Sequence, residues 1–174
     1  NGARADFRFW VLDLGLVVVL NSVSNQNNLN SKIENQKIKI LRHLKMTEQP
    51  IKRIAIFGST GSIGTQALDV IDANRDRFSV EVLTAHHNDE LLVQQAKQFN
   101  PNIVVIVDEK KYQVVKDALA STDVKVFAGE KALEEVAAMD VYDLMLAGIV
   151  GYAGLKPTLQ AIANGKAIAL ANKE

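Results

Sequence analysis

Residues 58–64 (GSTGSIG) form a glycine-rich segment in which three glycines are spaced three residues apart. An apolar run typical of a buried strand, residues 51–57, precedes the segment, and a helical pattern follows it. Between a strand and a helix, such glycines let backbone N–H groups approach a pyrophosphate, and the helix N-terminus adds partial positive charge. The segment therefore predicts a dinucleotide site at Gly58 and Gly61, to which Thr60 and Ser62 add hydroxyl donors. Because the spacing is not the commoner G-x-G-x-x-G, a tight connection without a ligand is the alternative.

Polar residues that follow two other predicted strands are the second group of candidates. His86, His87 and Asn88 follow the strand predicted at 79–85, where an NAD site usually places a carboxylate for the ribose. Histidine and asparagine can donate to a 2′-phosphate, so this loop favours NADP over NAD, although Asp89 follows closely and the histidines could be plain loop residues. No third ligand accompanies them, which disfavours a metal site. Lys173, after the last predicted strand, could hold a substrate phosphate.

Six short apolar runs alternate with helical patterns over the rest of the chain. Strands are expected at 51–57, 79–85, 103–107, 124–128, 142–147 and 167–171. Helices are expected after the glycine segment and at 90–99, 108–120, 129–139 and 152–164, the last with Leu155, Leu159 and Ile162 facing inward. This alternation predicts an α/β, Rossmann-like fold, a doubly wound and mostly parallel sheet with helices on both faces. Ligands of such sheets bind beyond the carboxyl ends of the strands, where the candidate residues fall.

Composition limits the possible partners and divides the chain. Lys and Arg (20) balance Asp and Glu (20), so no nucleic-acid partner is indicated, and the absence of cysteine excludes disulfides, thiolate metal sites and a cysteine nucleophile. Residues 1–45 carry seven basic and three acidic residues, against thirteen and seventeen in residues 46–174. We expect residues 1–45 to be an irregular or non-native extension, with a targeting segment as the alternative, and residues 46–174 to be the cofactor-binding domain. The apolar run 7–20 is shorter than the roughly 20 residues that span a bilayer, so no membrane partner is expected.

Four motifs in the second part of the chain resemble one enzyme family. They are residues 52–64 (KRIAIFGSTGSIG), 147–159 (AGIVGYAGLKPTL), 161–166 (AIANGK) and 170–174 (LANKE). In this order they are similar to the N-terminal part of 1-deoxy-D-xylulose 5-phosphate reductoisomerase. The resemblance implies an NADPH-dependent isomeroreductase of non-mevalonate isoprenoid biosynthesis. The family converts 1-deoxy-D-xylulose 5-phosphate to 2-C-methyl-D-erythritol 4-phosphate.

The resemblance also implies roles for individual residues. Thr60, Gly61, Ser62 and Ile63 would hold the cofactor phosphates and ribose, and His86, His87 and Asn88 would lie at the 2′-phosphate. Asn172 and Glu174 fall on cofactor contacts, and Lys173 falls on a substrate contact. The histidine pair departs from the family pattern, in which a small residue followed by Lys, Ser or Asn is more usual.

The family reaction needs Mg²⁺ or Mn²⁺, whose acidic ligands lie in a catalytic domain after the Asn-Lys-Glu string. No catalytic or metal-binding residue is therefore assigned within this chain, and we expect the chain alone to be inactive. The resemblance further implies a phosphosugar substrate, a homodimeric full-length enzyme and a bacterial cytoplasmic location, with plastid targeting less favoured. The alternatives are the cofactor domain of another NADP-dependent aldehyde or semialdehyde dehydrogenase, a non-enzymatic NADP sensor, and an α/β interaction domain that binds no nucleotide.

Overall fold

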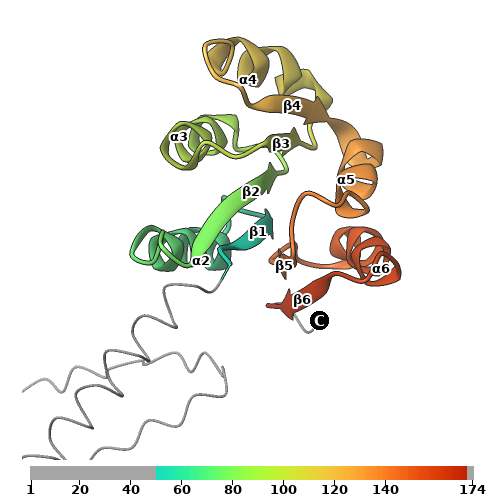
Figure 1. Cartoon of the computed structure of the whole chain (residues 1–174). Coiled ribbons are helices and arrows are strands. Elements are labelled where there is room, and N and C mark those ends of the chain that lie inside the picture. Colours follow the sequence, from blue (N-terminus) through green and yellow to red (C-terminus); the bar gives the residue numbers. More distant parts are fainter. Residues whose placement is uncertain (1–49, 172–174) are drawn as a thin grey trace, which may run out of the picture. The chain divides into compact units, whose positions relative to one another are not determined.

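A computed structural model describes residues 50–171 of the chain. The extension predicted at 1–45 and the residues Asn172, Lys173 and Glu174 lie outside this range, so the predicted domain boundary stays a prediction. Six parallel strands form one sheet in the order β4-β3-β2-β1-β5-β6 (Figure 1). The strands are β1 (Lys52–Phe57), β2 (Phe78–Ala85), β3 (Ile103–Ile106), β4 (Lys125–Ala128), β5 (Leu144–Ala147) and β6 (Ala167–Leu170). Each strand lies within two residues of its predicted boundaries.

Five α-helices connect the strands and cover the sheet on both faces. They are α2 (Ser62–Asp72), α3 (Asp89–Phe99), α4 (Tyr112–Ala118), α5 (Gly129–Ala137) and α6 (Leu155–Ala163). Short 3-10 turns precede two of them, η1 (Glu109–Lys111) before α4 and η2 (Tyr152–Gly154) before α6. Helices α2, α3 and α4 contribute to the core on one face of the sheet, and α5 and α6 contribute to the core on the other. The predicted doubly wound, Rossmann-like fold is confirmed.

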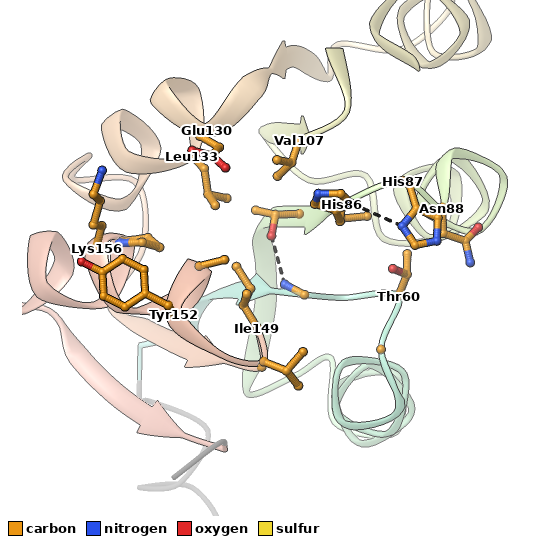
Figure 2. Close-up of a pocket in the computed structure, with 18 of the residues that line it drawn as sticks. Thr60, His86, His87, Asn88, Val107, Glu130, Leu133, Ile149, Tyr152 and Lys156 are labelled. Atoms are coloured by element: carbon orange, nitrogen blue, oxygen red, sulfur yellow. Dashed lines mark hydrogen bonds between the residues drawn. The ribbon is translucent and has the colours of Figure 1, made fainter. Parts of the chain in front are cut away.

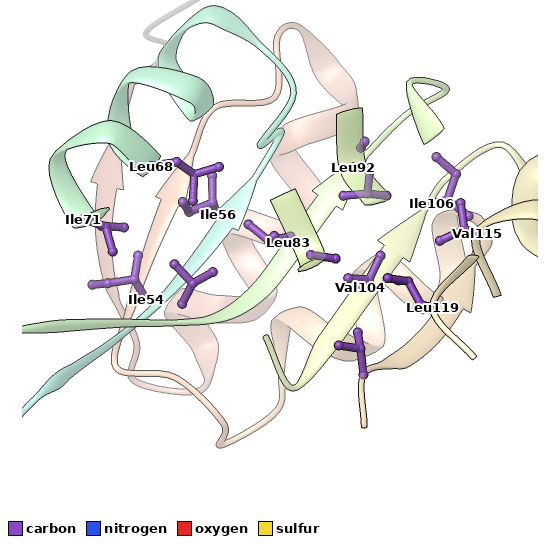
Figure 3. Packing of buried hydrophobic residues seen from close by; sticks show 14 residues of the cluster. Ile54, Ile56, Leu68, Ile71, Leu83, Leu92, Val104, Ile106, Val115 and Leu119 are labelled. Atoms are coloured by element: carbon purple, nitrogen blue, oxygen red, sulfur yellow. The ribbon is translucent and has the colours of Figure 1, made fainter. Parts of the chain in front are cut away.

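The two cores explain why β3 and the second part of β1, residues 54–57, are apolar without a break. On the face of α2, α3 and α4, Ile56, Leu83 and Val104 of neighbouring strands pack together under the helices (Figure 3). On the opposite face, Phe57 and Val105 pack with residues of α5. Strands that are buried on both faces need apolar side chains at every position, as parallel sheets usually show.

One predicted packing detail is wrong. Leu155, Leu159 and Ile162 of α6 were expected to face the core, but their exposed fractions are 45%, 54% and 55%. Helix α6 instead buries the smaller Pro157 and Ala161. The helix therefore uses small residues for close packing and leaves its larger apolar side chains on the outer side.

The order of the strands creates a crevice beside β1. Strands β1 to β4 add successively in one direction, and the chain then returns to place β5 on the other side of β1. The connections that leave β1 and β5 run to opposite faces of the sheet, which opens a space at their carboxyl ends. At the amino ends, an ion pair joins Arg53 of β1 to Asp143, the residue before β5, with Arg53 Nη2 2.7 Å from Asp143 Oδ1.

Within residues 50–171, none of the helices has both the length and the apolar character that crossing a membrane requires.

Candidate functional site

A cavity of about 570 Å³ opens at the carboxyl ends of β1, β2 and β5 (Figure 2). At this point of the sheet the order in which strands are added reverses, from β1–β4 on one side to β5 and β6 on the other. Its volume is within the range of small-molecule sites. The glycine segment after β1, the histidine loop after β2 and the segment after β5 all contribute to its wall. Six of the residues predicted from the sequence line it: Gly58, Thr60, Gly61, His86, His87 and Asn88.

The three glycines of the segment differ in what the fold requires of them. Gly58 has a φ of +90°, and a Cβ there would lie 3.0 Å from the carbonyl carbon of Gly148. A Cβ on Gly64 would collide with the carbonyl oxygen of Gly58 and lie 2.6 Å from Ser59 Cα. Gly61 has an ordinary extended backbone, φ −79° and ψ 169°, and a Cβ there would meet only the Gly58 oxygen, at 3.4 Å. The fold therefore requires Gly58 and Gly64, whereas Gly61 leaves space open toward the cavity.

The N-terminus of α2 lies directly behind this space. Among residues 50–171, no side chain caps the first turn of α2, and that turn contains no acidic residue. Its backbone N–H groups and partial positive charge are thus available to an anion. Thr60 lies beside the histidine loop (Figure 2), whereas Ser62 and Ile63 begin α2 with exposed side chains and do not line the cavity.

A buried polar cluster that the sequence did not predict fixes the position of the glycine segment. The hydroxyl of Ser59 donates to Gln95 Oε1 at 2.7 Å, and Gln95 Nε2 donates back to the Ser59 carbonyl oxygen at 2.9 Å. Thr84 accepts the backbone N–H of Gly58 at its hydroxyl, at 3.0 Å, and the N–H of Ser59 at its carbonyl oxygen, at 2.8 Å. The cluster ties the segment to β2 and α3. The signal for it was a polar residue, Gln95, within the stripe of α3 that faces the core.

Replacing Gln95 should destabilise the fold. In a Gln95→Leu chain, the buried Ser59 carbonyl oxygen loses the donor Gln95 Nε2, and the Ser59 hydroxyl keeps only the Thr84 carbonyl oxygen, at 3.2 Å. The expected cost is about 1–3 kcal/mol in the free energy of unfolding. Urea unfolding followed by circular dichroism measures this. Gln94→Leu, at an exposed position of the same helix, is the matched control and should change the free energy by less than about 0.5 kcal/mol. Equal effects of the two substitutions would contradict the assigned role of the cluster.

The histidine loop forms one end of the cavity. His86 and His87 are exposed, and their Nδ1 atoms are 3.3 Å apart, within hydrogen-bond distance when one of them carries the proton. The Asn88 side chain caps α3, because its Oδ1 accepts the N–H of Leu91 at 3.2 Å. Three polar side chains thus face a space that an anionic group could enter.

Residues of α5, η2 and α6 form the other end of the cavity. Figure 2 shows Glu130, Tyr152 and Lys156 across the cavity from the histidines. Lys156 pairs with Glu134 at 3.3 Å. The sequence predicted no role for these side chains, because their approach to the glycine segment depends on the order of the strands.

The cavity contains histidines and carboxylates, but they do not form a metal centre. Within residues 50–171, no group of three or more His, Asp or Glu side chains could hold a metal ion.

Comparisons with known proteins identify the family. The family model of 1-deoxy-D-xylulose 5-phosphate reductoisomerase matches residues 54–174. The chain belongs to this family. The reductoisomerase of Phocaeicola vulgatus is 55% identical over 123 residues, which are 71% of this chain and 32% of that protein. The chain spans about a third of the length of the curated relatives it matches.

Solved structures of reductoisomerases share the fold. The enzyme of Zymomonas mobilis, solved in complex with NADPH, superimposes with a TM-score of 0.69 at 45% identity, covering 72% of this chain and 33% of that one. A second reductoisomerase structure, in complex with NADPH, fosmidomycin and magnesium, gives a TM-score of 0.68 at 34% identity, covering 71% and 31%. This chain therefore corresponds to about a third of each of these structures, the third that contains the parallel sheet.

Proposed function

We propose that residues 46–174 are the NADPH-binding domain of a 1-deoxy-D-xylulose 5-phosphate reductoisomerase. The observation that carries this proposal is the open space at Gly61, between the uncapped N-terminus of α2 and the cavity at the switch of the sheet. A glycine that the fold itself does not need, placed at a helix N-terminus, suits the close approach of a pyrophosphate. Membership of the family, with a relative solved in complex with NADPH, supports the same ligand.

The residues present fit the two charged parts of NADPH. The backbone of Thr60 and Gly61 and the first turn of α2 would hold the pyrophosphate. His86, His87 and Asn88 would donate to the 2′-phosphate. Bound NADPH would supply the hydride that reduces the aldehyde formed by rearrangement of the phosphosugar. Asn172 and Glu174 are proposed as further cofactor contacts and Lys173 as a substrate contact, since they follow β6, whose carboxyl end lies at the same edge of the sheet as the cavity.

The activity of the whole enzyme is proposed for the full-length protein. We place the ligands of Mg²⁺ or Mn²⁺ beyond Glu174, consistent with relatives three times as long and with a family structure that contains magnesium. A homodimeric assembly of the full-length protein stays a prediction.

Equilibrium titration tests the proposed cofactor. NADPH fluorescence at constant ligand concentration should change saturably as the 174-residue chain is added, and excess NADP⁺ should reverse the change. If no binding is observed at millimolar chain concentration, the chain is better described as an α/β interaction domain without a nucleotide.

The histidine loop makes a prediction about the choice of cofactor. A His87→Glu substitution places a carboxylate beside the proposed 2′-phosphate, so the affinity for NADPH should fall by about tenfold while that for NADH changes little. The ratio of the two dissociation constants is the measurement. Gln98→Glu, which adds the same charge at an exposed position near the other end of α3, should leave the ratio unchanged. An unaltered ratio in His87→Glu would show that the 2′-phosphate lies elsewhere.

A further inference from the structure

A carboxylate lies directly beside the loop proposed to bind the 2′-phosphate, but it is buried. Asp89 follows Asn88 and is the first residue of α3. Its side chain is only 12% exposed, and its Oδ1 atom lies 3.1 Å from Lys111 Nζ. Asp89 is thus held in an ion pair instead of facing the cavity.

The segment that carries Lys111 is attached to the histidine loop through the backbone. The N–H of Val107 donates to the Ala85 carbonyl oxygen at 2.9 Å, and the N–H of Asp108 donates to the His86 carbonyl oxygen at 2.8 Å. Asp108 Oδ1 then accepts the N–H of Lys110, at 3.1 Å, and starts η1. These contacts place Lys111, the last residue of η1, within reach of Asp89.

The ion pair matters because Asp89 is charged. The hydrogen bond from Lys111 holds the pKa of the Asp89 carboxyl below its usual value, so the group stays ionised at neutral pH. A free carboxylate after the second strand would repel a 2′-phosphate and favour the 2′-hydroxyl of NAD instead. The charge of Asp89 must therefore be offset by a cation if this loop is to accept a phosphate.

We propose that Lys111 is a positioning residue for cofactor choice, which turns Asp89 away from the 2′-phosphate and offsets its charge. This role depends on the NADPH binding proposed above. Lys111 itself would not contact the cofactor. It acts through Asp89, and it leaves the histidine loop as the group that faces the phosphate.

Cofactor affinities of three variants of the 174-residue chain test this role. NADPH and NADH differ only in the 2′-phosphate, so the ratio of their dissociation constants isolates its contribution. In Lys111→Met at low ionic strength, NADPH should bind about fivefold more weakly while NADH changes less than about twofold. Adding Asp89→Asn to Lys111→Met should restore the original ratio, because the unpaired charge is then gone. Lys111→Arg should keep the ratio, since it keeps the pair.

Controls separate this role from general effects. Lys97→Met removes one positive charge from an exposed position in the last turn of α3 and should leave the ratio unchanged. If Lys111→Met does not fold, Lys111→Gln takes its place. The inference is overturned if the ratio is unchanged, if both cofactors weaken equally, or if Asp89→Asn fails to restore the ratio. No NADPH binding by the unmodified chain would overturn the proposed function and this role together, whereas preferential NADPH binding that is insensitive to Lys111 would overturn only the role.

Discussion

A Gly61→Val chain should fold like the unmodified protein and lose its affinity for NADPH. Valine readily adopts the extended backbone conformation of Gly61. Its Cβ would make one van der Waals contact, with the Gly58 carbonyl oxygen at 3.4 Å. Its methyl groups would instead occupy the space in front of the α2 N-terminus. We expect the affinity to fall by about 100-fold or more, at tenfold per 1.4 kcal/mol. Fluorescence titration with NADPH, together with thermal unfolding, measures the two effects separately.

Gly64→Ala is the matched control for Gly61→Val. A Cβ at Gly64 would collide with the backbone of the glycine segment, at Gly58 and Ser59. A Gly→Ala change inside a helix normally stabilises the helix by about 1 kcal/mol. If Gly64→Ala instead lowers the free energy of unfolding by about 3 kcal/mol or more, the cause is the steric collision and not helix propensity. The two substitutions thus separate Gly61, which leaves space for the ligand, from Gly64, which the fold requires. Unchanged NADPH affinity in a folded Gly61→Val chain would show that the segment is only a connection.

Much of the fold could be predicted because its signals are local. Strands buried on both faces read as unbroken apolar runs, as in residues 103–107, and helix ends carry their own markers. Asn100, before Pro101, takes the left-handed conformation that closes α3, with a φ of 47°. Asp108 caps η1, because its side chain accepts the N–H of Lys110. Alternation of such elements leaves few possible topologies, since parallel connections have a fixed hand.

The remaining features depend on contacts between distant parts of the chain. The orientation of α6 could not be predicted, because apolar residues occur on more than one side of this helix and their pattern does not indicate which side packs on the sheet. The pairing of Gln95 with Ser59 and that of Lys111 with Asp89 join residues on different elements. Only the order of the strands brings these elements together. The candidate site was therefore predictable as a set of loops after strands, but not as a set of side-chain partners.

The second prediction concerns catalytic turnover by the 174-residue chain alone, which lacks the proposed metal-binding domain. The 174-residue chain should bind NADPH but should not oxidise it in the presence of 1-deoxy-D-xylulose 5-phosphate, at any concentration of Mg²⁺ or Mn²⁺. Its described residues provide no metal site, and without a cation the rearrangement lacks stabilisation of its developing negative charge. The cavity also lies open to solvent at Val150 and Tyr152, whose exposed fractions are 78% and 76%, so water is not excluded from the site of reduction.

Absorbance at 340 nm follows NADPH consumption and gives the measurement. The full-length Phocaeicola vulgatus relative, 55% identical over the shared part, is the positive control under the same conditions. A chimera that continues this chain after Glu174 with the corresponding sequence of that relative should recover turnover, because it would restore the metal ligands and the cover over the cofactor. In the chimera, Gly61→Val should abolish turnover again, which would place the cofactor of the active enzyme at the glycine segment. Substrate-dependent NADPH consumption by the 174-residue chain alone would instead show that the chemistry resides in this domain.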